Sequence, residues 1–451
     1  MRRAARSATP NPARTHRANG QLMQQEPCFL ASFTVMGQSS IRHEGGLRVA
    51  YLTGEYPRAT DTFIQREVCA LRELGVEVHT FAVRCPSADQ QIGPAQVAEA
   101  ASTTYLLPAS AWQVVGAVVA AVRSPRRFIG AAALARRTHP KGVRGALIQC
   151  AYFAEAAVLA RHLRRLTIEH LHNHFPDSSG TVAMLAAHLA GVRFSFTMHG
   201  AEILRDVAKW RLDEKVARAA FGVSVSWYGR AQAMLVSPQE AWARLHVVRC
   251  GIDADQFAPT HHSGQRSQVL FVGRLDPVKG VPVLLDAFAL VLRDRPSARL
   301  TLVGDGPGRE AAQLQVETLA LGHAVHFAGH ATAAEVGEYL AAADVFVLPS
   351  FFEGIPVSLM EAMAAQVPVV ASQLPGIAEL VEHGEHGYLV PAGHTEQFAE
   401  RITALLSQPA LRQRMGVAGR AKVQAEFYVA AAAGELHRLF RGAAQEGSSG
   451  H

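Results

Sequence analysis

Short apolar runs recur along the chain from residue 47 onward, separated by helical segments and by polar loops that contain glycine. Each run is four to eight residues long, the length of a buried strand. Strands that alternate with helices build parallel sheets whose faces the helices cover. The pattern therefore predicts an α/β protein. The predicted strands are residues 47–53, 76–83, 168–172, 194–198, 222–226, 245–248, 269–272, 299–303, 324–328, 345–348 and 367–371.

Polar, turn-forming stretches divide the chain into domains. With 451 residues the chain is too long for one compact core, and two domains of about 200 residues each are expected. We place the first domain at residues 46–255 and the second at 268–425, with a polar linker between them. Residues 1–45 lack a sustained period and are predicted to be a disordered extension, or to precede a later methionine start. Residues 426–451 are predicted to be a helix that returns to the first domain, followed by a tail.

The net charge of +6 is concentrated in two stretches. Residues 1–45 hold six Arg and two Glu, and residues 101–154 hold seven Arg or Lys and no acidic residue, so the rest of the chain is net negative. A nucleic-acid binder usually spreads its basic residues over a recognition surface, so nucleic acid is not an expected partner. The five cysteines are far apart and form no Cys-x-x-Cys pair, which favours a reducing, cytoplasmic location over a disulfide framework or a zinc site.

The acid-free stretch also contains an apolar segment. Residues 112–122 are apolar but too short to span a bilayer, and basic residues follow them. One interpretation is that residues 112–147 make peripheral contact with an anionic membrane surface at the inner face of the cell membrane. The other is two packed helices with a solvated basic face. The basic residues are Arg123, Arg126, Arg127, Arg136, Arg137, Lys141 and Arg144.

Two carboxylates mark the loop and helix that follow strand 345–348. Glu353 lies in the loop, and Glu361 lies about one turn into a helix that begins near Val357. Both are expected at the carboxyl end of the strand, where open α/β sheets bind ligands. The unpaired N–H groups of the helix start suit a phosphate, and Pro356 is tolerated there because no donor is needed. The alternative is a solvated loop glutamate and an ordinary helix glutamate.

Two cations occupy the loop after strand 269–272. Arg274 and Lys279 are expected at the same sheet edge as Glu353, next to a helix that begins near Val281. Two positive side chains beside a helix N-terminus match a diphosphate group. Either residue standing alone would be interpreted as a solvated loop cation.

Histidines mark the strand ends of the first domain. His170, His172 and His174 alternate along one strand and so share a face, with the last two expected at its carboxyl end, facing a cleft. As metal ligands they would need a further acid or histidine, and no motif supplies one. His199 directly follows strand 194–198 and precedes a glycine, a position that favours a functional role.

Four segments of the second domain resemble the group 1 (family 4) glycosyltransferases. In order and spacing they cover nearly all of this domain, and together they are highly specific. The segments are Phe-Val-Gly-Arg-Leu...Lys-Gly at 271–280, Val-Gly-Asp-Gly-Pro at 303–307, Pro-Ser...Glu-Gly-Ile-Pro...Glu-Ala-Met-Ala at 349–364 and Gly-Ile-Ala-Glu-Leu-Val at 376–381.

The first domain resembles a subgroup of that family that works on exopolysaccharide, the colanic-acid-type transferases. Thr60-Asp61 stands where the subgroup more often has Ser-Glu, and residues 200–202 occupy a variable position, so the acceptor is left open. The matching pieces are Tyr56-Pro57, Thr60 to Ile64, Glu67, His172 to Phe175, and Phe194 to Thr197 running into His199.

The resemblance implies a GT-B fold, in which two Rossmann-like domains with parallel sheets face each other across a cleft. It implies transfer of a sugar, with retention of the anomeric configuration and without a metal ion or other cofactor. The donor is a nucleotide-diphosphate-sugar held by the second domain. The acceptor is a saccharide or lipid-linked saccharide held by the first, in exopolysaccharide or cell-surface glycan synthesis.

The resemblance also implies roles for individual residues. His199 and Glu353 are the expected catalytic residues, near the anomeric carbon and the donor sugar respectively. Arg274 and Lys279 would neutralise the leaving diphosphate, and Glu361 would bind the ribose hydroxyls. The other expected donor-binding residues are Gly273, Gly354, Ile355 and Pro356. The expected acceptor-side residues are Gly54, Thr60, Asp61 and His174.

Elementary chemistry agrees with this assignment, because cleavage of a sugar–diphosphate bond develops negative charge that fixed cations and N–H groups can stabilise.

The alternative function is that of a nucleotide-sugar 2-epimerase of the same architecture. That enzyme would require acid/base carboxylates in the first domain and would convert the donor without an acceptor. A non-catalytic binding partner is disfavoured, because the four charged residues of the second domain occur together.

Overall fold

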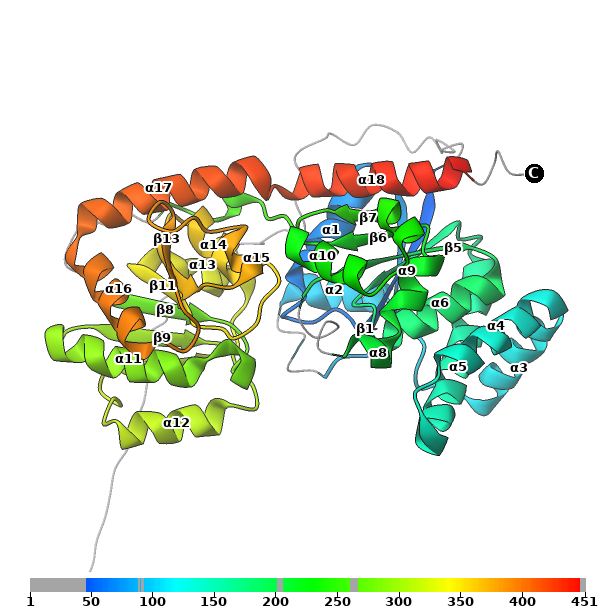
Figure 1. The fold of residues 1–451 in the computed structure, drawn as a ribbon, viewed down its shortest axis with the longest axis horizontal. Coiled ribbons are helices and arrows are strands. Elements are labelled where there is room, and N and C mark those ends of the chain that lie inside the picture. Colours follow the sequence, from blue (N-terminus) through cyan, green and yellow to red (C-terminus); the bar gives the residue numbers. More distant parts are fainter. Residues whose placement is uncertain (1–45, 88–89, 91–92, 201–205, 260–266, 447–451) are drawn as a thin grey trace, which may run out of the picture. The chain divides into compact units, whose positions relative to one another are not determined.

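Two parallel β-sheets and the helices that cover them make up the described part of the chain (Figure 1). The predicted extension at residues 1–45, most of the predicted linker and the tail lie outside it. The computed structural model describes residues 46–87, 90, 93–200, 206–259 and 267–446.

The first domain is built on a seven-stranded sheet whose neighbouring strands are all parallel. Its side chains alternate between two apolar clusters: Ala50 and Leu52 pack on one face of the sheet, and Val49 and Tyr51 on the other. From edge to edge the strands are β3 (Thr104–Tyr105), β2 (Glu77–Arg84), β1 (Arg48–Glu55), β4 (His170–His174), β5 (Arg193–Met198), β6 (Phe221–Ser224) and β7 (Leu245–Val247).

The second domain has a six-stranded sheet, also parallel throughout. Its two middle strands, β8 and β11, are far apart in the sequence, so the loops that follow them meet only because of the strand order. From edge to edge the strands are β10 (Val325–Gly329), β9 (Arg299–Val303), β8 (Gln268–Val272), β11 (Val345–Leu348), β12 (Val369–Ser372) and β13 (Gly387–Val390).

Helices connect the strands and cover the sheets. In the first domain they are α1 (Thr62–Glu73), α2 (Pro94–Ser102), α3 (Ala111–Val122), α4 (Pro125–Thr138), α5 (Gly142–Arg165), α6 (Ser178–Ala190), α8 (Val207–Trp210), α9 (Leu212–Arg218), α10 (Trp227–Leu235) and the 3-10 helix η2 (Gln239–Arg244). After the first sheet come η3 (Ala254–Gln256), η4 (Pro277–Lys279), α11 (Val281–Asp294), α12 (Arg309–Thr318), α13 (Ala333–Ala342), α14 (Val357–Ala364), α15 (Pro375–Ala378), α16 (Thr395–Ser407), α17 (Pro409–Glu426) and α18 (Val429–Glu446).

The predicted α/β fold with parallel sheets is confirmed, and the predicted strands agree with the observed ones to within two residues. The pattern does not predict the edge strands β3 and β13, which are short. The small shift matters at β4, because His172, Asn173 and His174 lie inside the strand and are completely buried. The prediction that these residues face a cleft is therefore wrong.

The end of the chain forms two helices, α17 and α18, of which α18 lies in the segment predicted to return to the first domain. The helical conformation is interrupted at Phe427 and Tyr428, where the backbone passes close to Gly251. A Cβ on this glycine would lie 2.4 Å from the Cα of Val429. From there α18 packs along α1 of the first domain (Figure 1). Its Phe440 is fully buried on the sheet, with ring centroids 5.0 Å from His170 and 5.4 Å from Phe221. The last helix thus completes one face of the first sheet.

The basic stretch that the sequence analysis singled out forms three helices, α3, α4 and α5, rather than two. Of the described helices, only α5 is both long and apolar enough to cross a membrane. It packs against α6 and α3, and its residues 156–160 are buried inside the first domain. Packing therefore accounts for apolar residues 156–160 of α5, whereas Val143 and Leu147 at its start are exposed.

Replacing Phe440 by Ala should destabilise the first domain. Loss of a buried phenyl ring leaves a cavity between α18 and the central strands, and such changes cost about 3 to 5 kcal/mol. We expect that decrease in the free energy of unfolding measured by guanidinium denaturation. Arg438→Ala on the same helix is the control, since the side chain of Arg438 is 74% exposed. Equal effects of the two substitutions would contradict the docking of α18.

Candidate functional site

Lys279 and Glu353, from two different loops of the second domain, form an ion pair. Lys279 Nζ lies 2.6 Å from Glu353 Oε1, and the Ser350 hydroxyl donates to the same oxygen, also over 2.6 Å. The two charged side chains are largely buried, with 23% and 10% of their surfaces exposed. The cation predicted for the diphosphate and the carboxylate predicted for the sugar therefore hold each other in place.

Close backbone contact between the loops after β8 and β11 produces this ion pair. The Phe351 amide donates to the Val278 carbonyl oxygen over 2.8 Å and joins the loops. Gly280 is in the left-handed conformation, with φ +66°, and packs against Pro349. A Cβ here would lie 2.1 Å from the Pro349 carbonyl oxygen, so both the conformation and the space require glycine.

Arg274 lies outside this ion pair. Its guanidinium contacts Asp276 Oδ2 within its own loop, at 3.2 Å, and 51% of its side chain is exposed. Gly273 donates its amide to the Val303 carbonyl oxygen and extends the pairing of β8 with β9. Lys279 is therefore held in one place, whereas Arg274 can turn toward a ligand. Their joint role on a diphosphate stays a prediction.

Glu361 is paired with a residue of the first domain. Arg66, on α1, donates through Nη2 to Glu361 Oε1 over 2.8 Å. Both side chains are mostly buried, with 15% and 12% of their surfaces exposed. The other terminal nitrogen of Arg66, Nη1, is buried and has no hydrogen-bond partner among the described residues. Arg66 is thus paired with the carboxylate that is predicted to bind the ribose.

The helix that carries Glu361, α14, begins directly after Pro356, which is its N-cap residue. Within the described part of the chain no side chain caps this helix, so its first N–H groups keep their capacity to bind an anion. Ile355 and Pro356 are buried, and Ile355 belongs to the apolar core of the domain. These two predicted donor-side residues support the loop from inside.

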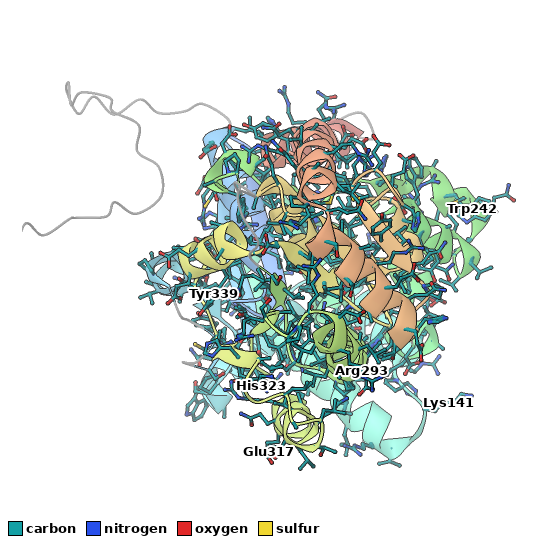
Figure 2. All side chains as sticks on the ribbon, turned by 90° about the vertical axis from the view of Figure 1, so that its left-hand side faces the viewer. Lys141, Trp242, Arg293, Glu317, His323 and Tyr339 are labelled. Atoms are coloured by element: carbon teal, nitrogen blue, oxygen red, sulfur yellow. The ribbon has the colours of Figure 1, made fainter. Side chains whose placement is uncertain are left out.

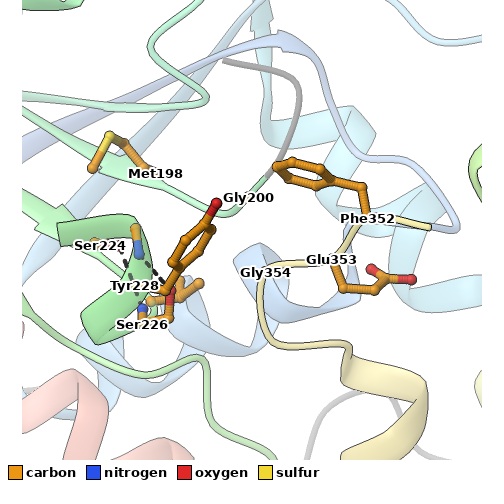
Figure 3. A pocket seen from close by; sticks show the side chains of 10 residues that line it. Met198, Gly200, Ser224, Ser226, Tyr228, Phe352, Glu353 and Gly354 are labelled. Carbon is orange, nitrogen blue, oxygen red and sulfur yellow. Dashed lines mark hydrogen bonds between the residues drawn. The ribbon is translucent and has the colours of Figure 1, made fainter. Parts of the chain in front are cut away.

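Glycines bring loops of the two domains into backbone contact. A Cβ on Gly354 would lie 2.2 Å from the His199 carbonyl oxygen, and a Cβ on Gly376 would lie 1.9 Å from that of Gly354. The cavity between these loops measures about 10 Å³, roughly the space of one water molecule. Figure 3 shows the Tyr228 ring projecting toward the gap between Gly200 and Gly354, while the Glu353 carboxylate points away from it. A sugar fits here only if the loops move apart.

His199 belongs to a chain of polar contacts that fixes its ring. Burial lowers the pKa of His199 well below its usual value, and His174 adds to this effect, so the ring is neutral. Burial also raises the pKa of the Cys250 thiol, whose sulfur lies 3.3 Å from His199 Nδ1. His199 Nε2 lies 2.6 Å from His174 Nδ1, and one of these two nitrogens carries the hydrogen of the bond. His174 Nε2 lies 3.2 Å from Glu67 Oε1, which also accepts a hydrogen bond from the Tyr51 hydroxyl.

Both ring nitrogens of His199 are thus engaged inside the protein. The ring also lies between Phe63 and Phe175, with centroid distances of 4.5 and 4.9 Å. His174, predicted on the acceptor side, is fully buried and contacts His199 instead of solvent. The structure therefore places His199 at the predicted sheet edge, as a fixed neutral ring rather than a free base.

The structure supplies the acid that the sequence analysis did not find near the histidines of β4. One ligand atom each from Glu67, His172 and His174 lie within 4.8 Å of one another, a grouping that could hold a metal ion. However, His172 Nδ1 is bonded to Ser195 Oγ at 2.7 Å and Nε2 to Thr197 Oγ1 at 2.9 Å. Too few ligand atoms remain for a four-coordinate zinc site. We assign the cluster to the positioning of His199.

The loop after β1 carries the remaining predicted acceptor-side residues. Asp61 is only 3% exposed and is bonded to Arg58 Nε at 2.7 Å. Burial raises the pKa of Asp61, and the Arg58 charge opposes that shift. Thr60 is exposed, and a Cβ on Gly54 would meet no atom within 4 Å. Thr60 and Gly54 therefore border open space, whereas Asp61 supports the loop.

The sequence analysis assigned no role to several polar residues that the fold brings to this region. Arg66 and Ser350 contact the predicted site residues directly. Glu379 accepts hydrogen bonds from the Trp227 and Tyr228 amides, each over 2.9 Å, at the start of α10. Glu67 was noticed only as part of the family resemblance. Position gives a signal only for some of them, since Ser350 lies in the loop after β11, whereas Arg66 and Glu67 lie in the second turn of α1.

Comparison with known proteins identifies the family of this chain. Residues 253–422 match the family model for glycosyl transferases group 1. Escherichia coli (strain K12) WcaL, named as a colanic acid biosynthesis glycosyltransferase, is 29% identical over 380 residues, which cover 79% of this chain and 90% of WcaL. A GDP-mannose-dependent alpha-(1-6)-phosphatidylinositol monomannoside mannosyltransferase of Mycobacterium tuberculosis is 30% identical over 305 residues, covering 62% of this chain and 78% of that protein.

Solved structures share the fold. Sucrose-phosphate synthase from Thermosynechococcus elongatus superposes with a TM-score of 0.67 and 21% identity, over 88% of this chain and 98% of that one. Anabaena Alr3699/HepE, crystallised with UDP and glucose, gives a TM-score of 0.66 and 18% identity over 87% and 98% of the two chains. None of the proteins named here is an epimerase, so the epimerase alternative gains no support. The chain has the GT-B fold and belongs to the group 1 glycosyltransferases.

Proposed function

We propose that this glycosyltransferase moves a sugar, with retention at the anomeric carbon and without a metal ion, from a nucleotide-diphosphate-sugar to a saccharide or lipid-linked saccharide. We place the reaction in exopolysaccharide or cell-surface glycan synthesis. The names of relatives support this assignment: WcaL is named for colanic acid biosynthesis, and the mycobacterial relative for GDP-mannose and a phosphatidylinositol glycan. The Anabaena neighbour of the same fold was crystallised with UDP and glucose.

The ion pair of Lys279 with Glu353 is the observation that carries the proposal. As the bond from the sugar C1 to the diphosphate breaks, its electron pair goes to the leaving phosphate. The acceptor hydroxyl oxygen forms the new bond to C1, and its proton passes to the leaving phosphate. Lys279 and the N–H groups at the start of α14 would receive that charge, which is the main catalytic need of this reaction. Arg274 would turn in from its exposed position to add a second cation. This arrangement supplies the charge that a metal ion would otherwise provide.

Glu353 and His199 would shape the sugar site in different ways. Glu353 holds Lys279 through Oε1, and its other carboxylate oxygen would contact the sugar once the loops separate. His199 is fixed by His174 and Glu67, and its carbonyl oxygen lies against Gly354, so its neutral ring would form a rigid border of the sugar site. Neither role requires His199 to take up a proton, which agrees with the lowered pKa of its ring.

Donor binding would break the Arg66–Glu361 ion pair and widen the space between the Gly200 and Gly354 loops. The ribose hydroxyls need the Glu361 carboxylate that Arg66 now occupies, so Arg66 must move away. The sugar needs more than the roughly 10 Å³ between the Gly200 and Gly354 loops. Both changes separate the same elements, α1 and β5 of the first domain from the β11 loop and α14 of the second.

We also propose a cytoplasmic enzyme that makes peripheral contact with an anionic membrane. Trp112, Val115, Val119 and Val122 recur along one face of α3 and are 83%, 52%, 52% and 49% exposed. The stretch from residue 101 to 154 that contains this helix holds seven basic residues and no acid. An apolar helix face beside an excess of positive charge is suited to an anionic bilayer surface.

Replacing Lys279 by Ala should lower kcat/KM for transfer by about 10²- to 10³-fold, the loss typical when one charge-stabilising donor is removed. Activity is measured as nucleoside diphosphate release that depends on the acceptor. Lys422→Ala, which breaks only an exposed ion pair with Glu426, is the control and should retain activity. Dialysis against a chelator should leave the wild type active. Full activity of Lys279→Ala would contradict the diphosphate assignment. Loss of wild-type activity on dialysis, restored by adding a metal ion, would contradict metal independence.

Replacing Arg66 by Ala should tighten donor binding, because the nucleotide no longer competes with the guanidinium for Glu361. We expect the donor Kd from titration calorimetry to fall about threefold to tenfold, the effect of roughly 1 kcal/mol. Glu361→Gln should instead raise the Kd. A higher Kd in Arg66→Ala would show that Arg66 itself binds the donor.

Replacing Trp112 by Glu should weaken flotation with vesicles of phosphatidylcholine and phosphatidylserine at low salt, since it places a negative charge on the exposed face of α3. Leu314→Glu in the second domain is the control, because Leu314 is also exposed, at 64%, but lies outside the basic stretch. Absence of vesicle binding by the wild type, or equal binding by both variants, would remove the membrane proposal.

A further inference from the structure

A second cavity, of about 220 Å³, opens in the first domain between the end of α4, the start of α5, and α6 and α8. Three of its lining residues are cations, Lys141, Arg144 and Lys209, and none is acidic. Lys141 and Arg144 are exposed, as the position of Lys141 in Figure 2 illustrates. Lys209 Nζ lies over the Trp210 ring, 4.3 Å from its centre, and Trp210 also lines the cavity. The charge of this cavity fits an anion.

The start of α5 adds to the positive potential. Lys141 is the N-cap residue of this long helix, and within the described residues no side chain caps it. The first N–H groups of α5 therefore lie unpaired by a cap next to Arg144 and Gly145, which line the cavity. Helix N-termini of this kind favour phosphate, and charge-assisted hydrogen bonds from Lys and Arg strengthen the interaction.

Gln149 gives the cavity a second kind of recognition. Its side chain lines the cavity, is only 5% exposed, and has a carbonyl oxygen, Oε1, without a hydrogen-bond partner in the described structure. The orientation of the amide is fixed by Thr138, whose hydroxyl donates to the Leu134 carbonyl oxygen and accepts from Gln149 Nε2 over 3.0 Å. A buried acceptor without a donor costs free energy that a ligand hydroxyl would recover.

An apolar surface borders the same cavity. Val143, Leu147 and Ile148, on the first turns of α5, are 79%, 67% and 37% exposed, and Ile148 itself lines the cavity. A small soluble anion would leave this surface in water. A lipid would cover it, because the headgroup can enter the cavity while the bilayer contacts the apolar side chains.

We propose that this cavity binds the phosphate and an adjoining hydroxyl of an anionic polyol-phosphate lipid headgroup. The phosphate contacts Lys141, Arg144 and Lys209, and the hydroxyl donates to Gln149 Oε1. The ligand is a membrane lipid rather than a soluble phosphate ester, because Val143, Leu147 and Ile148 require apolar cover. The site is separate from the sheet-edge site, with which it shares no lining residue.

A buried lysine links the cavity to the shell around His199. Lys215 is fully buried, and its Nζ donates to the carbonyl oxygens of Trp210, Pro176 and Asp177 at 2.5, 2.8 and 2.8 Å. Trp210 lines the cavity, and Phe175, next to Pro176, packs against His199. Occupation of the cavity can therefore stabilise the wall of the sheet-edge site. This link alone rests on the proposed function.

The test measures binding to vesicles without donor or acceptor, so that it stands apart from the transfer assay. Flotation uses phosphatidylcholine vesicles that contain either phosphatidylglycerol or, at equal charge, phosphatidylserine, whose headgroup lacks a polyol hydroxyl. The variant Lys141→Gln/Arg144→Gln/Lys209→Gln removes the cavity cations. The matched control Arg123→Gln/Arg126→Gln/Arg136→Gln removes three exposed charges of the same basic stretch that do not line the cavity. Thermal unfolding midpoints show whether each variant is folded.

We expect the affinity of the cavity variant for phosphatidylglycerol vesicles to be at least tenfold lower than that of the control variant. Gln149→Leu should abolish the preference of the wild type for phosphatidylglycerol over phosphatidylserine while both vesicles still bind. Equal losses in the two triple variants, or no lipid preference in the wild type, would overturn the proposal. Titration with glycerol phosphate separates the two sources of the ligand: binding as tight as that to vesicles would overturn the assignment to a lipid.

Discussion

The ion pair between Lys279 and Glu353 is the interaction on which the account of this enzyme depends. It exists because β8 and β11 are neighbours in the second sheet, so the loops that follow them are joined by the Phe351–Val278 hydrogen bond and by the close packing of Gly280. A cation held at 2.6 Å by a carboxylate is fixed before any ligand arrives. Preorganised charge of this kind stabilises a leaving diphosphate without the reorganisation that water would need.

The first domain contributes a rigid surface rather than charge. Its central strand reads His-Leu-His-Asn-His and is buried throughout, an unusual composition for the middle of a sheet. Burial lowers the pKa of His170 to about 3 and that of His172 well below its usual value, so these rings serve as neutral hydrogen-bonding groups. His174, whose Nε2 lies 3.2 Å from Glu67, contacts His199 and holds it beside Gly354 of the second domain.

The sequence predicted the α/β fold, most strands, the loops that carry Lys279 and Glu353 and the helix that carries Glu361, because buried strands and helix starts leave periodic and compositional signals. It did not predict the partners of these residues. Arg66 and Glu361 are 295 positions apart, and nothing local marks an ion pair between them. The same holds for the burial of His174, since a polar run such as His172-Asn173-His174 resembles the end of a strand in the sequence. The basic stretch shows a further limit of the sequence. Its basic residues could be read from the sequence, but the cavity between α4, α5, α6 and α8 could not.

A crystal structure with a nucleoside diphosphate bound tests the central claim most directly. The account predicts that Lys279 Nζ lies within hydrogen-bond distance of the terminal phosphate, that the first N–H groups of α14 point at the diphosphate, and that Glu361 contacts the ribose in place of Arg66. A diphosphate bound elsewhere, with the Lys279–Glu353 and Arg66–Glu361 pairs unchanged, would contradict it.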